Sequence, residues 1–68
     1  MTVVVNGTSA QLADGATLAD VVRSLGRDPQ RPGTAAARNG EVVPRRVWEA
    51  TPLAEGDRIE LLDAVGGG

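Results

Sequence analysis

The sequence predicts a small α+β domain in which one helix covers one face of a mixed β-sheet. Three observations lead to this fold class: two Asn-Gly pairs typical of tight hairpins, one amphipathic helical pattern, and a final alternating strand pattern that leads into three glycines. Neither a repeat nor a linker divides these segments. We therefore expect one domain over residues 1–65, followed by a flexible glycine tail at residues 66–68.

The chain opens with a predicted hairpin. Residues 2–5 are β-branched throughout and end at Asn6-Gly7, the strongest two-residue hairpin signal. An uninterrupted valine run suits a strand covered on both faces better than an edge strand. Residues 8–12 are more polar and are expected to return as the second strand.

A helix follows, because the hydrophobic period changes from two to three and four. Four apolar residues at i, i+3, i+4 and i+7 share one helical face: Leu18, Val21, Val22 and Leu25. Thr17 stands at the N-cap position, and Asp20 three residues later completes a capping-box pattern. Gly26 is a suitable stop signal. The apolar face of this helix needs a sheet to cover.

The second half of the chain predicts a loop and three further strands. Residues 27–33 contain two prolines and a glycine and are expected to form the loop. Residues 34–38 and 41–43 form short strands around the second Asn-Gly pair, and Pro44 ends the pairing because it has no N–H donor.

A single helical turn is predicted over residues 45–50, with Leu53 as an apolar plug beneath it. In the last strand Ile59 and Leu61 alternate with charged residues. A hairpin, a crossing helix and these later strands predict a β-grasp-like domain with a mixed four- to five-stranded sheet.

Composition restricts the chemistry. The chain has 68 residues, no cysteine and no histidine, so it offers no thiolate and lacks the commonest general base and metal ligand. All basic residues are arginines, the net charge is −2, and a single tryptophan is the only aromatic residue. These features argue against a resident catalytic centre and against nucleic-acid binding. No run is apolar enough to span a membrane, so we expect a soluble, cytoplasmic protein.

The terminal glycines Gly66, Gly67 and Gly68 have two interpretations. A tail without side chains can enter a narrow channel and place the Gly68 carboxylate inside another protein. The alternative is a frayed terminus without function, because chain ends are commonly disordered. The tail alone does not decide between them.

Several motifs together resemble the ThiS-type sulfur carriers of thiamine biosynthesis, which are ubiquitin-like β-grasp proteins. The resemblance extends over essentially the whole chain, including the opening valine run and the helix. Its most specific elements are Asn39-Gly40-Glu41-Val42-Val43-Pro44-Arg45, Trp48, Leu53, Gly56-Asp57 and the final Gly67-Gly68.

This resemblance implies a carrier that is not an enzyme and binds no cofactor itself. An E1-like adenylyltransferase of the ThiF type would use ATP and magnesium to adenylate the Gly68 carboxylate. Sulfur from a persulfide donor enzyme would then give a thiocarboxylate, and a ThiG-type thiazole synthase would receive that sulfur. Gly66 and Gly67 would pass through the active sites of these partners.

The main candidates for docking to these partners are Leu62, Val65 and Arg45. Leu62 lies opposite Ile59 and Leu61 in the strand alternation and could form an exposed apolar patch with Val65. Arg45, together with Arg46, could contact an acidic partner surface, or it could simply be solvated. The tryptophan could likewise anchor a partner or pack in the core.

Two alternatives to the thiamine carrier remain open at this point. One is the small subunit of molybdopterin synthase, which also ends in Gly-Gly and carries a thiocarboxylate. Those proteins tend to be longer and richer in aromatic residues. The other is a non-covalent ubiquitin-like interaction module whose tail is inert.

Overall fold

The computed structural model describes residues 1–63, and statements about structure below refer to that part of the chain. Its elements follow one another in the predicted order. They are β1 (Thr2–Val5), β2 (Thr8–Gln11), α1 (Leu18–Ser24), β3 (Thr34–Arg38), β4 (Glu41–Val43), the 3-10 helix η1 (Arg45–Ala50) and β5 (Arg58–Asp63).

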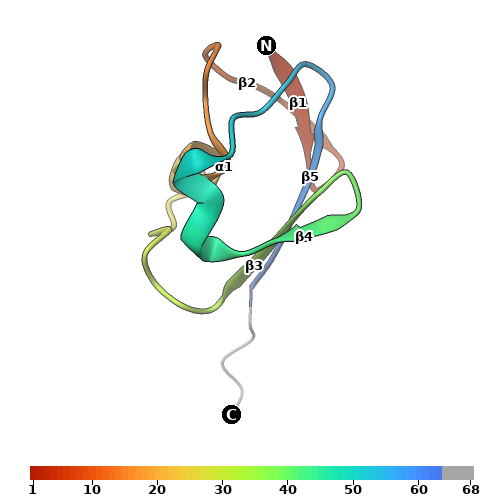
Figure 1. Ribbon diagram of the computed structural model, residues 1–68. Coiled ribbons are helices and arrows are strands. Elements are labelled where there is room, and N and C mark those ends of the chain that lie inside the picture. Colours follow the sequence, from red (N-terminus) through yellow and green to blue (C-terminus); the bar gives the residue numbers. More distant parts are fainter. Residues whose placement is uncertain (64–68) are drawn as a thin grey trace.

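The strands form one five-stranded sheet in the order β2-β1-β5-β3-β4 (Figure 1). The last strand, β5, therefore lies in the centre of the sheet. It runs parallel to β1 and antiparallel to β3, and both hairpins are antiparallel. This mixed sheet with one main helix confirms the predicted β-grasp architecture.

Both Asn-Gly pairs form the predicted turns, and both asparagine side chains bind the central strand. Asn6 and Asn39 have φ values of 49° and 50°, in the left-handed region that asparagine tolerates well. The amide of Asn6 exchanges two hydrogen bonds with the backbone of Leu61, at 3.2 and 2.8 Å. Asn39 accepts a hydrogen bond from the Arg58 amide at 2.9 Å. The turns therefore fix β5 as well as their own hairpins.

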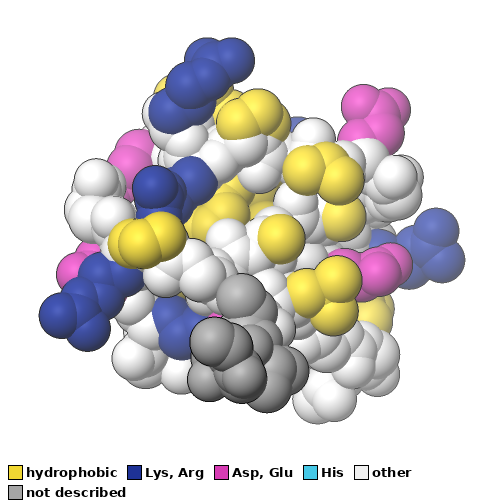
Figure 2. Space-filling model, turned by 90° about the horizontal axis from the view of Figure 1, so that it is seen from below, with side chains coloured by type: hydrophobic (Ala, Val, Ile, Leu, Met, Phe, Trp, Pro, Cys, Tyr) yellow, Lys and Arg dark blue, Asp and Glu magenta, His cyan; other side chains and the backbone are white. Residues whose placement is uncertain are grey.

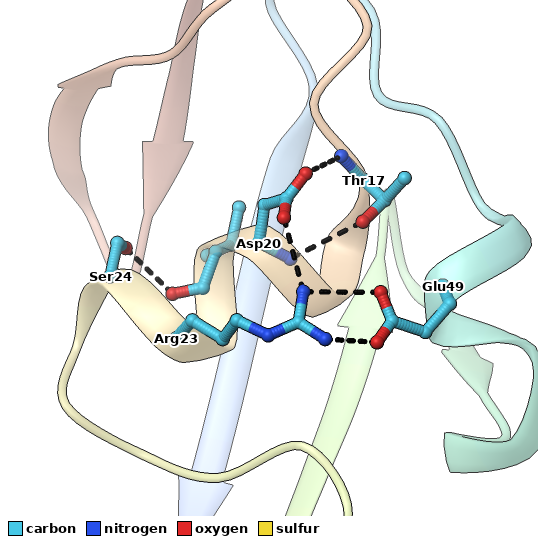
Figure 3. Close-up of polar contacts among 6 residues, drawn as sticks. Thr17, Asp20, Arg23, Ser24 and Glu49 are labelled. Carbon is cyan, nitrogen blue, oxygen red and sulfur yellow. Dashed lines mark hydrogen bonds and ion pairs between the residues drawn. The ribbon is translucent and has the colours of Figure 1, made fainter.

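The N-terminus of α1 has the predicted capping box (Figure 3). Thr17 Oγ1 accepts from the Asp20 amide at 3.3 Å, and the Thr17 amide donates to Asp20 Oδ2 at 2.9 Å. The bond from the Thr17 amide is the main cause that lowers the pKa of the Asp20 carboxyl. Arg23 on the next turn donates to both Asp20 and Glu49, which connects α1 to η1.

The C-terminus of α1 ends in a Schellman motif. The Gly26 amide donates to the Arg23 carbonyl at 2.9 Å, and the Arg27 amide donates to the Val22 carbonyl at 3.3 Å. Gly26 takes a φ of 78°, which a residue with a Cβ adopts only at a cost. Leu25 is the C-cap and is 44% exposed, so its predicted place on the buried helical face is wrong.

The core lies between α1, η1 and one face of the sheet. Trp48 is 1% exposed, and its indole Nε1 donates to the Val43 carbonyl at 2.8 Å, which confirms the packing interpretation of this residue. Leu53 is buried, as predicted. The cluster consists of Val3, Val5, Leu18, Ala19, Val21, Val22, Ala36, Trp48, Leu53, Ile59 and Leu61.

One expectation about β1 is only half correct. The strand is interior, as predicted, since β2 and β5 pair with its two edges. However, Val3 and Val5 are buried whereas Val4 between them is only half-buried. Among residues 1–63, α1 and η1 pack against the same face of this sheet, so the valine run does not indicate cover on both faces.

Candidate functional site

The candidate site begins where β5 ends. Gly66, Gly67, Gly68 and Val65 lie outside the described residues, and their predicted roles stay predictions. The structure describes the region directly before these residues. It comprises Leu62 and Asp63 at the end of β5 and the surfaces on the two sides of the sheet at that point.

On the helix side, the carboxylate of Asp63 is bound from two other elements. Arg27 Nε donates to its two oxygens at 2.8 and 2.9 Å, and Arg27 Nη2 also donates to Oδ2. Thr34, the cross-strand neighbour of Asp63 on β3, donates from Oγ1 to Oδ1 at 2.9 Å. These hydrogen bonds, first that of Arg27 and then that of Thr34, lower the pKa of the Asp63 carboxyl.

An open hollow of about 590 Å³ surrounds this cluster and is lined by the loop after α1. Its lining residues are Gly26, Arg27, Asp28, Arg31, Pro32, Gly33, Thr34 and Asp63. The hollow is polar and lies directly beside the end of β5. A partner that receives the chain after Asp63 would have to approach this rim.

On the open side of the sheet, Leu62 is 68% exposed, which confirms its predicted outward orientation. Val42 on β4 is 79% exposed, and Ala35 and Ala37 on β3 line the same shallow groove together with Glu60 of β5. We call Leu62, Val42, Ala35 and Ala37 the open-face patch. Figure 2 views the molecule from the end at which β5 terminates and shows several hydrophobic side chains at the surface there.

Sequence reasoning found Leu62 but missed Val42 as a member of this patch. The signal lies in strand alternation: the Val43 side chain packs against the core, so residue 42 beside it points to the opposite face. The short strand was too brief for alternation to be recognised. Arg45 and Arg46 are exposed beside a hollow lined also by Gln30, Pro44 and Glu49. Nothing in these contacts tests the docking role of Arg45, which stays a prediction.

Sequence analysis named Gly56-Asp57 in the resemblance but did not predict that the Asp57 carboxylate, directly before β5, is buried. Asp57 is 7% exposed and accepts from Arg38 Nε at 2.9 Å, Asn39 Nδ2 at 3.0 Å and the Ala54 amide at 2.8 Å. Burial alone raises the pKa of the Asp57 carboxyl, but the three hydrogen bonds and the Arg38 charge together lower it. Three donors from β3, the second Asn-Gly turn and the Ala54 backbone hold this carboxylate, which therefore stabilises the fold.

The described residues hold no group of three or more side chains that could bind a metal ion. No helix within the described part of the chain is long and apolar enough to cross a membrane. Every buried side-chain nitrogen or oxygen in this region has a hydrogen-bond partner. The arrangement presents a strand end between a polar hollow and an apolar patch, which suits a protein that offers its terminus to partners.

Comparisons with known proteins agree with this geometry. The model of the ThiS family matches residues 3–68. The sulfur carrier protein ThiS of Escherichia coli strain K12 is 32% identical over 68 residues, which cover the whole of both chains. A thiazole synthase of Paramagnetospirillum magneticum is 29% identical over 68 residues, which are the whole of this chain and 20% of that protein.

Solved structures give the same result. The crystal structure of the thiamine biosynthesis protein ThiS from Geobacter metallireducens superposes with a TM-score of 0.79 at 30% identity, and the match covers the whole of both chains. A solution structure of a thiamine biosynthesis protein from the same organism gives a TM-score of 0.78 at 30% identity and is covered to 88%. The chain therefore belongs to the ThiS family, whose members are sulfur carrier proteins and not enzymes.

Proposed function

We propose that this chain carries sulfur for thiazole formation in thiamine biosynthesis as a thiocarboxylate on Gly68. The family match is the observation that supports this most strongly, since it extends to residue 68 and includes both final glycines. The presented end of β5 is consistent with it, because a carrier needs an accessible terminus and no catalytic group of its own. The same match favours the thiamine carrier over the molybdopterin synthase subunit and over an inert interaction module.

Activation proceeds in three balanced steps. The Gly68 carboxylate is an anion at neutral pH and a poor electrophile. One of its oxygens attacks the α-phosphorus of ATP in a ThiF-type adenylyltransferase that uses magnesium, and pyrophosphate leaves. The terminal sulfur of a donor persulfide then attacks the acyl carbon, and AMP leaves with the bonding electrons. A thiol reduces the resulting acyl disulfide, which leaves the thiocarboxylate and a disulfide.

Transfer to a ThiG-type thiazole synthase follows. A protein named thiazole synthase contains a segment similar to this whole chain. Such a segment within one polypeptide supports a partnership in which the carrier and the synthase act at close range.

Docking uses the open-face patch. An exposed apolar cluster beside a functional terminus is typical of a binding surface, and Leu62 and Val42 are the two most exposed large hydrophobic residues of the described chain. Leu62 stands directly before Asp63, so a partner that covers it also receives the residues that follow. The docking roles predicted for Val65 and Arg45 stay separate proposals, since Val65 lies outside the described residues and Arg45 borders a different hollow, with Gln30 and Glu49.

The test is incubation with ATP, magnesium and the cognate adenylyltransferase, followed by intact-mass measurement. The unaltered chain should gain an adenylate and, with a persulfide donor and a thiol, exchange one oxygen for sulfur. Gly67→Val should block both changes, because a branched side chain next to the terminus cannot pass a channel shaped for glycine. Normal thiocarboxylate formation by Gly67→Val would contradict the threading mechanism, and an unmodified wild-type chain would contradict the proposed function itself.

A further inference from the structure

We propose that Arg27, Asp63 and Thr34 form a clamp that fixes the end of β5 and so positions the Gly68 terminus for activation. The clamp deepens the proposed function and rests on it. Its residues come from three elements: the loop after α1, the end of β5 and the start of β3.

The clamp acts on the last pair of the β3–β5 ladder. Thr34 and Asp63 are register partners at the end of the two strands, where pairing has no further neighbour within the described chain. Strand ends open locally at little cost. The bond between the Thr34 hydroxyl and the Asp63 carboxylate, together with the Arg27 bonds, opposes that opening at Asp63, the last residue that the structure describes.

Arg27 is a firm anchor because its own backbone is held. Its amide closes the Schellman motif on the Val22 carbonyl, and Val22 is fully buried in the core. The guanidinium therefore extends from the packed C-terminus of α1, not from a free loop. Its planar fork also matches the carboxylate through more than one N–H group, which a lysine could not reproduce.

The position of this anchor matters because few residues separate Asp63 from the Gly68 carboxylate. The five residues after Asp63 span at most about 17 Å when fully extended. Each residue that frays from β5 moves the fixed point back by about 3.4 Å. Fraying also increases the conformational freedom of the residues that connect β5 to Gly68. This lowers the effective concentration of the Gly68 carboxylate in the active site of a docked partner. The clamp prevents this loss without touching the reacting atoms.

The clamp is not a major source of global stability. The side chains of Arg27 and Asp63 are 38% and 45% exposed, and ion pairs at that exposure contribute little to unfolding free energy. Its effect is local, and the test must therefore measure the strand end and the activation step separately.

The experiment compares Arg27→Ala with Arg31→Ala in the full chain. Both changes remove one positive charge from the lining of the same hollow, but only Arg27 binds Asp63. Arg27→Ala should speed amide hydrogen exchange at the Thr34–Asp63 end of the ladder by about two- to fivefold, as expected for losing one exposed pair. The Arg38–Ile59 end of the same ladder is the internal reference and should not change.

Adenylation kinetics supply the functional readout. Arg27→Ala should raise the KM for the carrier by a similar factor with kcat unchanged, since the chemistry after threading is the same. Arg31→Ala should leave both constants unchanged. Asp63→Arg combined with Arg27→Asp should restore part of the loss in exchange protection and KM, which a direct contact between Arg27 and the partner would not allow.

Two results would overturn the proposal in different ways. If Arg27→Ala matches Arg31→Ala in exchange and in KM while the wild type is adenylated normally, the clamp has no positioning role and the carrier function stands. If the wild-type chain is not adenylated, the proposed function and the positioning role fall together.

Discussion

The two ends of β5 each have an aspartate bound by an arginine, yet their surroundings differ. At the start of the strand, Asp57 is buried and receives three donors, one of them a backbone amide. At the end, Asp63 is exposed, and its donors among the described residues are two side chains, Arg27 and Thr34. Asp57 connects the residues directly before β5 to β3 and to the second Asn-Gly turn. Asp63 connects the last residue of β5 to Arg27 and to Thr34 of β3.

This difference shows how one strand can stabilise the fold at one end and offer the chain terminus to partner proteins at the other. A buried, fully bonded carboxylate is expensive to disturb, because its removal leaves its donors without a partner. An exposed pair can be broken and reformed at low cost. We therefore expect changes at Asp57 to affect mainly the free energy of unfolding. Changes at Asp63 should affect mainly the local order of the end of β5.

Among changes to the two aspartates of this comparison, the largest expected effect comes from Asp57→Ala. It leaves the Arg38 guanidinium, the Asn39 amide and the Ala54 amide without their acceptor. We expect a loss of about 2–3 kcal/mol in the free energy of unfolding, measured by urea denaturation. Asp63→Ala is the matched control and should cost much less. Equal losses at the two ends would contradict the contrast between them.

A smaller effect is expected from the turn asparagines. Asn39→Gly keeps the positive φ but removes bonds to Asp57 and Arg58, and should cost about 1–2 kcal/mol. Asn6→Gly removes bonds to the Leu61 backbone only.

The two turns can be separated by double mutants with Asp57→Asn. Asn39→Gly should be strongly non-additive with that change, because the two side chains share a hydrogen bond. Asn6→Gly should be additive. Additivity for both would show that the Asn39 amide does not support the buried carboxylate.

Acid should weaken both ends of β5, with different sensitivity to salt. The folded-state pKa values of Asp57 and Asp63 are both lowered from 3.8. The stability that each contributes is therefore present above about pH 4 and is lost as pH falls through the lower folded value. Added salt should reduce the part that Asp63→Asn removes, because that pair is exposed. The part removed by Asp57→Asn should persist. If the contribution of Asp63 to the free energy of unfolding did not depend on salt, its ion pair would behave like the buried pair of Asp57, which contradicts the comparison.

The smallest effect on stability is expected at Leu62. Leu62→Ala should leave the melting temperature nearly unchanged and weaken binding to the adenylyltransferase, since the side chain is exposed on the open-face patch. Leu61→Ala, its buried neighbour, should instead cost about 2–5 kcal/mol. Isothermal titration and thermal unfolding of both variants make the comparison. A large loss of stability in Leu62→Ala would assign this residue to the core.

Local patterns predicted most of the elements because their causes are local. The capping box at Thr17 and Asp20, the stop at Gly26 and the two Asn-Gly turns each involve residues within a few positions of one another. Alternation in β5 also predicted that Leu62 points away from the core. Leu25 was misplaced because the helix ends before it, so helical spacing no longer governs where its side chain points.

The sequence by itself therefore determined the α+β class and the turns. It also determined which reactive side chains the protein has, since the chain contains neither cysteine nor histidine. Only the tertiary structure decided which distant residues meet on the central strand: Arg38 with Asp57, and Arg27 with Asp63. The physical reason is that these pairs depend on strand register and on the packing of α1 across the sheet. A charged residue in a loop or turn looks the same in the sequence whether solvent or a carboxylate far along the chain receives its hydrogen bonds.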